Sequence, residues 1–243
     1  MPSTAQTLPA ALAAAMSQDP ARPLVTHLGP DGARTELSVR TFENNAAKAA
    51  NLLRDDVDAA PGDPVALALP LHWQTAVWTA ACGLVGAVAR IGEDTSGVEL
   101  AVVGPDGLDL PLAPITLATS LHPLGMPFTT PLPTGLQDAA VEVRAHGDRF
   151  SPSYPVRADD PWLTLGTTTL THAEALDAAR ALAASLGVEA GGRLLVARPL
   201  DRDSLLALVA LPLAVGAAVV VLADPASDPD TVRAREGTTA VLS

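Results

Sequence analysis

Two stretches of the chain repeat one order of elements, and this repetition restricts the possible folds more than any other feature. The first stretch begins at Thr35 and the second at Thr168. Each reads as a short strand, a helix, a turn, an apolar strand that ends at a proline, a second helix and a further apolar strand. Strands that alternate with helices favour parallel sheets covered by helices. We therefore predict an α/β protein of two related subdomains, each a mostly parallel sheet flanked by helices.

Local signals support the elements of the first stretch. Ser38 or Thr41 is expected to cap its first helix, because a side-chain oxygen at that position accepts a hydrogen bond from a free backbone N–H. The apolar strand Val65–Leu69 ends at Pro70, and a helix is predicted over Trp73–Val85 before Gly86. Upstream of this stretch, Thr7 is the predicted N-cap of a short helix with Pro9 in its first turn.

The second stretch has matching signals. Thr171 followed by Glu174 forms the sequence of a capping box, and Gly191-Gly192 marks the turn that precedes its apolar strand. A helix is predicted over Ser204–Val215, with Gly216 as its C-terminal stop. The strand that follows contains three consecutive valines, as a buried strand commonly does.

A segment rich in proline, glycine and threonine separates the two stretches. It covers residues 104–160, and the short runs Val98–Val103 and Ile115–Leu121 resemble strands. We expect an ordered but irregular surface connection here in preference to a functional lid. The predicted division is a first α/β subdomain with its connection at residues 1–150 and a second α/β subdomain at residues 151–243.

Composition and charge exclude several classes of function. The formal net charge is −12, which disfavours nucleic acids and anionic membranes, because affinity for both depends on Lys and Arg. The chain holds one cysteine, Cys82, so no disulfide framework and no thiolate metal site is expected. The five histidines are also far apart in sequence: His27, His72, His122, His146 and His172. No metal site is predicted, and a reducing, cytoplasmic location fits.

One apolar segment has the length of a membrane span. Residues 205–223 form an uncharged run, but Pro212 lies inside it and Gly216 follows. The composition then changes from leucine and alanine to β-branched valine, which favours a buried helix followed by a buried strand. The N-terminal apolar run has no positive charge before Arg22, so it does not resemble a secretory signal.

Sequence motifs for common chemistry are absent. The chain contains no G-x-S-x-G, no G-x-x-x-x-G-K and no G-x-G-x-x-G. The acidic group Asp55, Asp56 and Asp58 follows a predicted helix, and solvated loop acids are its ordinary explanation.

The stretch WLTLGTTTLTH, Trp162–His172, carries a resemblance to a known family. Gly166-Thr167-Thr168 lies between a strand and a capped helix. This arrangement is similar to the phosphate-binding loop of the adenylate-forming, or AMP-binding, superfamily, which includes acyl-CoA synthetases and adenylation domains. The resemblance implies a nucleotide-binding site of five residues: Thr164, Gly166, Thr167, Thr168 and His172.

Further segments resemble the N-terminal portion of the same superfamily. The first stretch through PGDPVALALP is similar to the family's opening region, and LAVGAAVVVLADP is similar to the strand after the loop. The resemblance covers most of residues 20–95 and 160–243, and the chain looks like a short AMP-binding-enzyme-like protein of high-GC bacteria.

The departures from the family pattern concern its chemistry. Leu165 replaces the usual serine, and the Gly-x-Pro-Lys-Gly part of the loop is missing before Leu170. The loop is therefore expected to be a tighter turn with fewer free N–H groups, a degenerate form of the phosphate loop. The family's later motifs for adenine, ribose and magnesium, and its lid lysine, have no counterpart in this sequence. No catalytic residue is predicted.

Three functions remain open. The first is a non-catalytic relative of adenylate-forming enzymes, an interaction or regulatory protein that forms a homo-oligomer or binds a protein partner. The second is a reduced nucleotide- or acyl-binding protein, as part of a ligase that a partner chain completes. The third is a decaying gene product with no selected role. No cofactor is expected, although ATP, AMP or acyl-CoA would be the ligand of the second.

Overall fold

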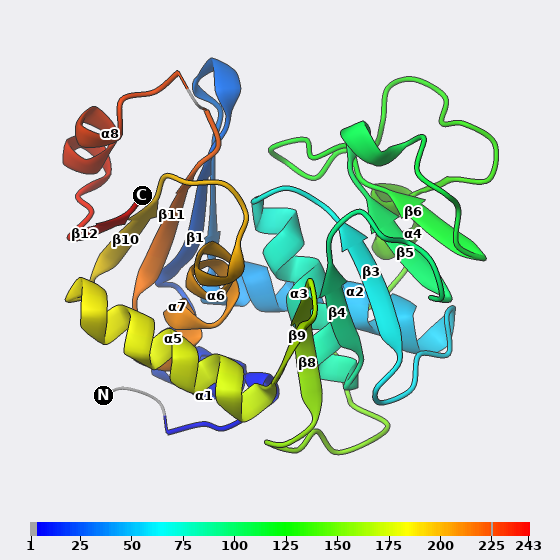
Figure 1. Ribbon diagram of the computed structural model, residues 1–243, viewed down its shortest axis with the longest axis horizontal. Coiled ribbons are helices and arrows are strands. Elements are labelled where there is room, and N and C mark those ends of the chain that lie inside the picture. Colours follow the sequence, from blue (N-terminus) through cyan, green and yellow to red (C-terminus); the bar gives the residue numbers. More distant parts are fainter. Residues whose placement is uncertain (1–3, 225) are drawn as a thin grey trace. The chain divides into compact units, whose positions relative to one another are not determined.

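The computed structural model describes residues 4–224 and 226–243. Within them the chain forms two compact units that are interleaved along the sequence (Figure 1). Unit 1 comprises Met1–Glu43, Leu71–Trp73 and Ala173–Ser243, and unit 2 comprises Asn44–Pro70 and Gln74–His172. These bounds differ from the expected division at residue 150, because each unit takes strands from both halves of the chain.

Unit 1 is built on a five-stranded sheet in the order β12-β10-β11-β1-β2, in which only β1 and β2 pair in antiparallel fashion. Its strands are β1 (Pro23–Leu28), β2 (Arg34–Ser38), β10 (Arg193–Val196), β11 (Ala218–Leu222) and β12 (Ala240–Leu242). Its helices are α1 (Leu8–Gln18), α5 (His172–Leu186), α6 (Arg202–Val209), α7 (Leu211–Val215) and α8 (Pro229–Glu236). A 3-10 turn, η1 (Pro30–Gly32), joins β1 to β2.

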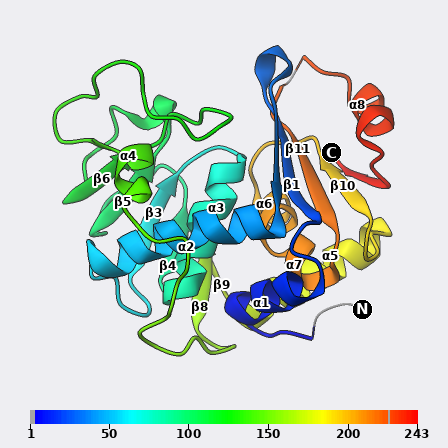
Figure 2. The same ribbon diagram turned by 180° about the vertical axis from the view of Figure 1, so that it is seen from behind.

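Unit 2 is built on a seven-stranded sheet in the order β7-β6-β5-β3-β4-β8-β9. Its strands are β3 (Pro64–Ala68), β4 (Val88–Ile91), β5 (Leu100–Val103), β6 (Ile115–Ala118), β7 (Gln137–Asp138), β8 (Pro161–Leu165) and β9 (Thr168–Thr171). Its other elements are α3 (Trp73–Val85), η2 (Pro105–Gly107), α4 (Ala139–Arg144) and most of α2 (Val39–Asp55). The opposite views in Figures 1 and 2 show α2 along one face of these strands.

The two sheets contain the same arrangement of five strands, β12-β10-β11-β1-β2 in unit 1 and β5-β3-β4-β8-β9 in unit 2. In each sheet, a hairpin from one stretch of the sequence pairs with strands of the other stretch. The hairpin β1–β2, whose second strand opens the first stretch, pairs through β1 with β11 of the second stretch. The hairpin β8–β9, whose second strand opens the second stretch, pairs through β8 with β4 of the first stretch. The predicted fold class, α/β with mostly parallel sheets, is confirmed.

Predicted helix starts agree with the structure where their hydrogen bonds are described. Thr7 accepts a bond from the Ala10 N–H at the start of α1, and Ser38, rather than Thr41, accepts from the Thr41 N–H at the start of α2. Each bond satisfies one of the free N–H groups of a first helical turn.

The long apolar segment forms two helices and a strand. The predicted single helix Ser204–Val215 is broken into α6 and α7 around Ala210, because Pro212 has no N–H to continue the helical ladder. Gly216 ends α7 with φ 76°, a left-handed conformation that favours glycine, and β11 follows. In the described part of the chain, no helix combines the length and apolarity needed to cross a bilayer.

The connection between the stretches contributes strands to the sheet of unit 2. It supplies β6 and β7 and the short helix α4. The side chain of Asn51, on α2, donates to the carbonyl oxygens of Gly147 (2.8 Å) and Arg149 (2.9 Å). These bonds hold the irregular segment that leads to β8.

Candidate functional site

The five residues of the predicted site belong to the β8–β9 hairpin and the first turn of α5. Leu165 pairs with Thr168, so the loop between the strands has only two residues, Gly166 and Thr167. Gly166 has φ 58°, whereas Thr167 is not among the residues with positive φ. A glycine with positive φ at the first of two loop positions matches a type II′ turn, whose twist suits a hairpin.

The threonines of the hairpin present hydroxyl groups at its surface. Thr167 and Thr168 are exposed, and Thr164 is half-buried. The Oγ1 atoms of Thr164 and Thr169 lie 2.9 Å apart across the two strands, so these hydroxyls hydrogen-bond to each other. The hairpin thus brings four of the predicted site residues together: Thr164, Gly166, Thr167 and Thr168.

His172 occupies a different environment from the threonines. Its ring is fully buried and stacks on Trp162 at 5.1 Å between centroids, with 4° between the planes. The Trp162 indole N–H donates to the Thr79 carbonyl at 2.9 Å. Burial lowers the pKa of His172 to about 4, although the nearby Asp160 opposes the shift. His172 is therefore neutral at pH 7 and forms part of the core.

The residues that flank the hairpin along the chain are acidic. Residues 162–172 contain no Lys or Arg, and Asp159, Asp160 and Glu174 flank them. Asp160 accepts the Arg157 backbone N–H at 2.7 Å. The hairpin therefore offers hydroxyl groups and backbone atoms but no positive side chain of its own.

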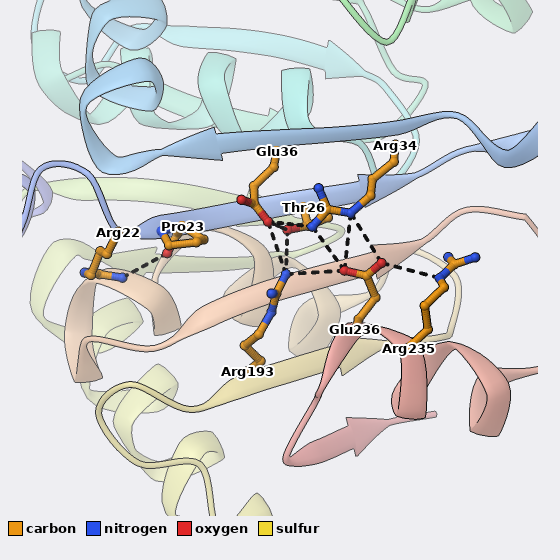
Figure 3. Close-up of polar contacts among 8 residues, drawn as sticks. All are labelled: Arg22, Pro23, Thr26, Arg34, Glu36, Arg193, Arg235 and Glu236. Atoms are coloured by element: carbon orange, nitrogen blue, oxygen red, sulfur yellow. Dashed lines mark hydrogen bonds and ion pairs between the residues drawn. The ribbon is translucent and has the colours of Figure 1, made fainter.

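Sequence reasoning did not identify a network of charged residues in unit 1. Figure 3 shows Glu236, at the end of α8, facing Arg34 of β2 and Arg193 of β10. The Thr26 hydroxyl of β1 donates to Glu36 at 2.9 Å, and Glu36 also contacts Arg34 at 2.7 Å. Thr26 and Glu36 stand opposite each other in register, but Glu236 is 200 positions further along the chain than Glu36. No local pattern could have placed it there.

Two further histidines meet in the core of unit 1. The rings of His27 and His72 lie edge to face with their centroids 4.1 Å apart, and both residues are buried. Burial lowers the pKa of His27 to about 4. Across residues 4–224 and 226–243, no three His, Cys, Asp or Glu side chains are grouped so that they could hold a metal ion.

A curated relative identifies the family. The chain is 35% identical over 230 residues to a TIGR03089 family protein of Mycobacterium tuberculosis (strain ATCC 25618 / H37Rv), and the match covers 90% of each protein. The chain belongs to the TIGR03089 family. No protein-family model matches it.

Two solved structures with this fold are described as acyl-CoA synthetases. An acyl-CoA synthetase of Brucella canis superposes with a TM-score of 0.73 at 19% identity, over 92% of this chain. A fatty acyl CoA synthetase of Mycobacterium tuberculosis superposes with a TM-score of 0.70 at 18% identity, over 96% of this chain. The chain spans 45% and 48% of the length of these two proteins. The resemblance to the N-terminal portion of the adenylate-forming superfamily is therefore confirmed at the level of the fold.

Proposed function

We propose that this TIGR03089 family protein is a non-catalytic relative of the adenylate-forming enzymes and that it acts as an interaction or regulatory protein. Fold alone does not determine activity, so the proposal rests on the hairpin whose sequence resembles the phosphate loop of the superfamily.

The two-residue turn Gly166-Thr167 is the observation that carries this proposal. A loop that binds phosphate surrounds it with several free backbone N–H groups, usually beside a lysine or a helix N-terminus. Here the strands pair up to Leu165 and Thr168, so only the turn itself is left to provide such groups. The Thr164 hydroxyl is engaged with Thr169.

Electrostatics support the same proposal. A triphosphate is stabilised by positive charge and by charge-assisted hydrogen bonds. The hairpin carries no Lys or Arg between residues 162 and 172, and acidic residues flank it in sequence. His172 supplies no charge at pH 7, because burial lowers its pKa to about 4.

An interaction role requires a partner, and we propose a second copy of the chain. The proposal is supported by β12, one of the two edge strands of the sheet in unit 1. Residues 238–243 contain no charge and no proline, the features that usually protect an edge strand from pairing.

A thermal-shift titration tests the absence of ligand binding. ATP, AMP, acyl-CoAs and free fatty acids are added to the purified protein at millimolar concentration. A ligand at one hundred times its dissociation constant stabilises a protein by about 2.7 kcal/mol, which would raise the melting temperature measurably. We expect no shift. A shift with ATP or acyl-CoA that is lost in Gly166→Val would support the ligand-binding alternative instead.

A further inference from the structure

Helix α8 covers one face of the sheet in unit 1 with very little apolar surface. Only two of its side chains are buried, Val232 and Glu236. Val232 packs in a small cluster with three residues of the sheet, Leu28, Leu195 and Val220. One valine gives a short helix a weak hydrophobic attachment, since most helices in proteins are held by a continuous apolar stripe.

Glu236 provides the second attachment. Its side chain is 6% exposed, and its Oε2 atom lies 3.2 Å from Arg34 Nη2 and 3.5 Å from Arg193 Nη2. Arg34 also donates through Nε to Glu236 Oε1 at 3.3 Å. The two arginines extend from β2 and β10, which lie on opposite sides of β1 and β11 (Figure 3). The carboxylate thus fastens the end of α8 to both sides of the sheet.

The guanidinium group of Arg193 is held in place by several oxygen atoms. Its Nη2 atom contacts three acceptors: Thr26 Oγ1 at 2.9 Å, Glu36 Oε2 at 3.3 Å and Glu236 Oε2 at 3.5 Å. Arg235 also lies 3.5 Å from Glu236, but its side chain is 60% exposed, against 23% for that of Arg193. Exposed pairs of this kind contribute little to stability.

We propose that α8 is a charge-held cover that opens locally, without unfolding of the sheet, when the ion pairs of Glu236 with Arg34 and Arg193 are weakened. Two local features border helix α8 in the sequence. Asp224 bonds to Ser227 before it, and Gly237 adopts φ 62° after it. Opening exposes Leu28, Leu195 and Val220, an apolar patch in the middle of the sheet.

Hydrogen exchange of the full chain, resolved by peptide, tests this cover. Glu236→Gln keeps the size of the side chain but removes its charge, so α8 amides should exchange about tenfold faster or more. The amides of Val219–Val221 in the central strand β11 should keep their rate. Arg235→Gln is the matched control on the same helix, and we expect it to leave the exchange of α8 unchanged.

Two further measurements, on the variant Arg34→Gln and on the wild type at high ionic strength, keep the proposal testable even if Glu236→Gln does not fold. Arg34 is partly exposed, and its replacement should accelerate α8 in the same direction. Raising the salt from about 0.1 M to about 1 M shortens the screening length from about 10 Å to about 3 Å. The α8 amides of the wild type should then exchange faster, whereas those of Glu236→Gln should change little. The cover is disproved if α8 exchanges at the rate of β11 in every variant, or if neither substitution nor salt affects it.

Discussion

Trp162 and His172 stack in the core of unit 2, and the same burial that creates this contact disfavours a charged imidazole. His27, on strand β1 of unit 1, is buried as well, and burial also lowers its pKa. Each pKa is lowered from 6.5 to about 4 in the folded protein. Between these values the unfolded chain binds more protons than the folded chain, so stability falls as the pH is lowered.

This difference predicts an acid-sensitive stability in a defined pH window. Each histidine contributes full stability above pH 6.5 and loses about 1.4 kcal/mol per pH unit towards pH 4. Urea unfolding at several pH values between 7 and 4.5 measures the slope. His172→Gln and His27→Gln should each reduce it, and His122→Gln, at an exposed position, should not. An unchanged slope in both buried variants would contradict the assignment.

Substitutions of Gly166 test the backbone conformation of the β8–β9 turn. A Cβ atom at this position would meet no other atom within 4 Å, so any cost of substitution comes from φ 58° and not from a clash. We expect Gly166→Val to lower the free energy of unfolding by about 1–2 kcal/mol, since a β-branched residue disfavours positive φ. Gly166→Asn should cost less, because asparagine tolerates this region. Equal losses in urea unfolding would disagree with a positive φ.

Among the elements, helix α2 covers the sheet of unit 2 and also binds the irregular segment that precedes β8. Asn51 is 5% exposed and holds the carbonyl oxygens of Gly147 and Arg149. Asn51→Ala leaves two carbonyl groups without this donor, and we expect a loss of about 1–3 kcal/mol. Trypsin should also cut after Arg149 faster than in the wild type. Asn44→Ala, a half-buried asparagine on the same helix, serves as control, and equal rates of cleavage after Arg149 in both variants would oppose this role.

Most elements could be predicted from the sequence because their signals are local. The helix Trp73–Val85 has the predicted bounds, and strand β3 follows the predicted run Val65–Leu69 within one residue at each end. The break between α6 and α7 was missed, although Pro212 is visible in the sequence, because a proline near a helix start is also tolerated. Strand β6 lies within the strand-like run Ile115–Leu121, whereas the two-residue strand β7 is too short to show a periodicity and is recognised only by its pairing with β6.

At the scale of the whole molecule, the exchange of hairpins between the sheets is what sequence reasoning could not supply. Periodicity indicates a strand but not its partner, and both β1–β2 and β8–β9 pair with strands far away in sequence. The proximity of Thr164, Gly166, Thr167 and Thr168 could be expected from the sequence, since they are contiguous with one turn. The burial of His172 against Trp162 depends on the three-dimensional packing.

Association with a second copy is a property of the whole molecule and has its own test. Sedimentation equilibrium at micromolar concentration should show a dimer or larger oligomer. Val241→Lys places a charge on the edge strand β12 and should shift the population to monomer. Val141→Lys, at an exposed position of α4, should have no effect. A wild-type protein that sediments as a monomer would remove the support for a homo-oligomer.

The absence of adenylate formation is the central claim, and carboxylate-dependent exchange of labelled pyrophosphate into ATP measures it most directly. The assay uses the purified full chain with a broad panel of carboxylic acids, and an active adenylate-forming enzyme serves as positive control. The two-residue turn at Gly166 and the lack of Lys or Arg in residues 162–172 predict no exchange above background. Robust exchange that is lost in a folded Gly166→Val variant would contradict the account and would make the protein an enzyme.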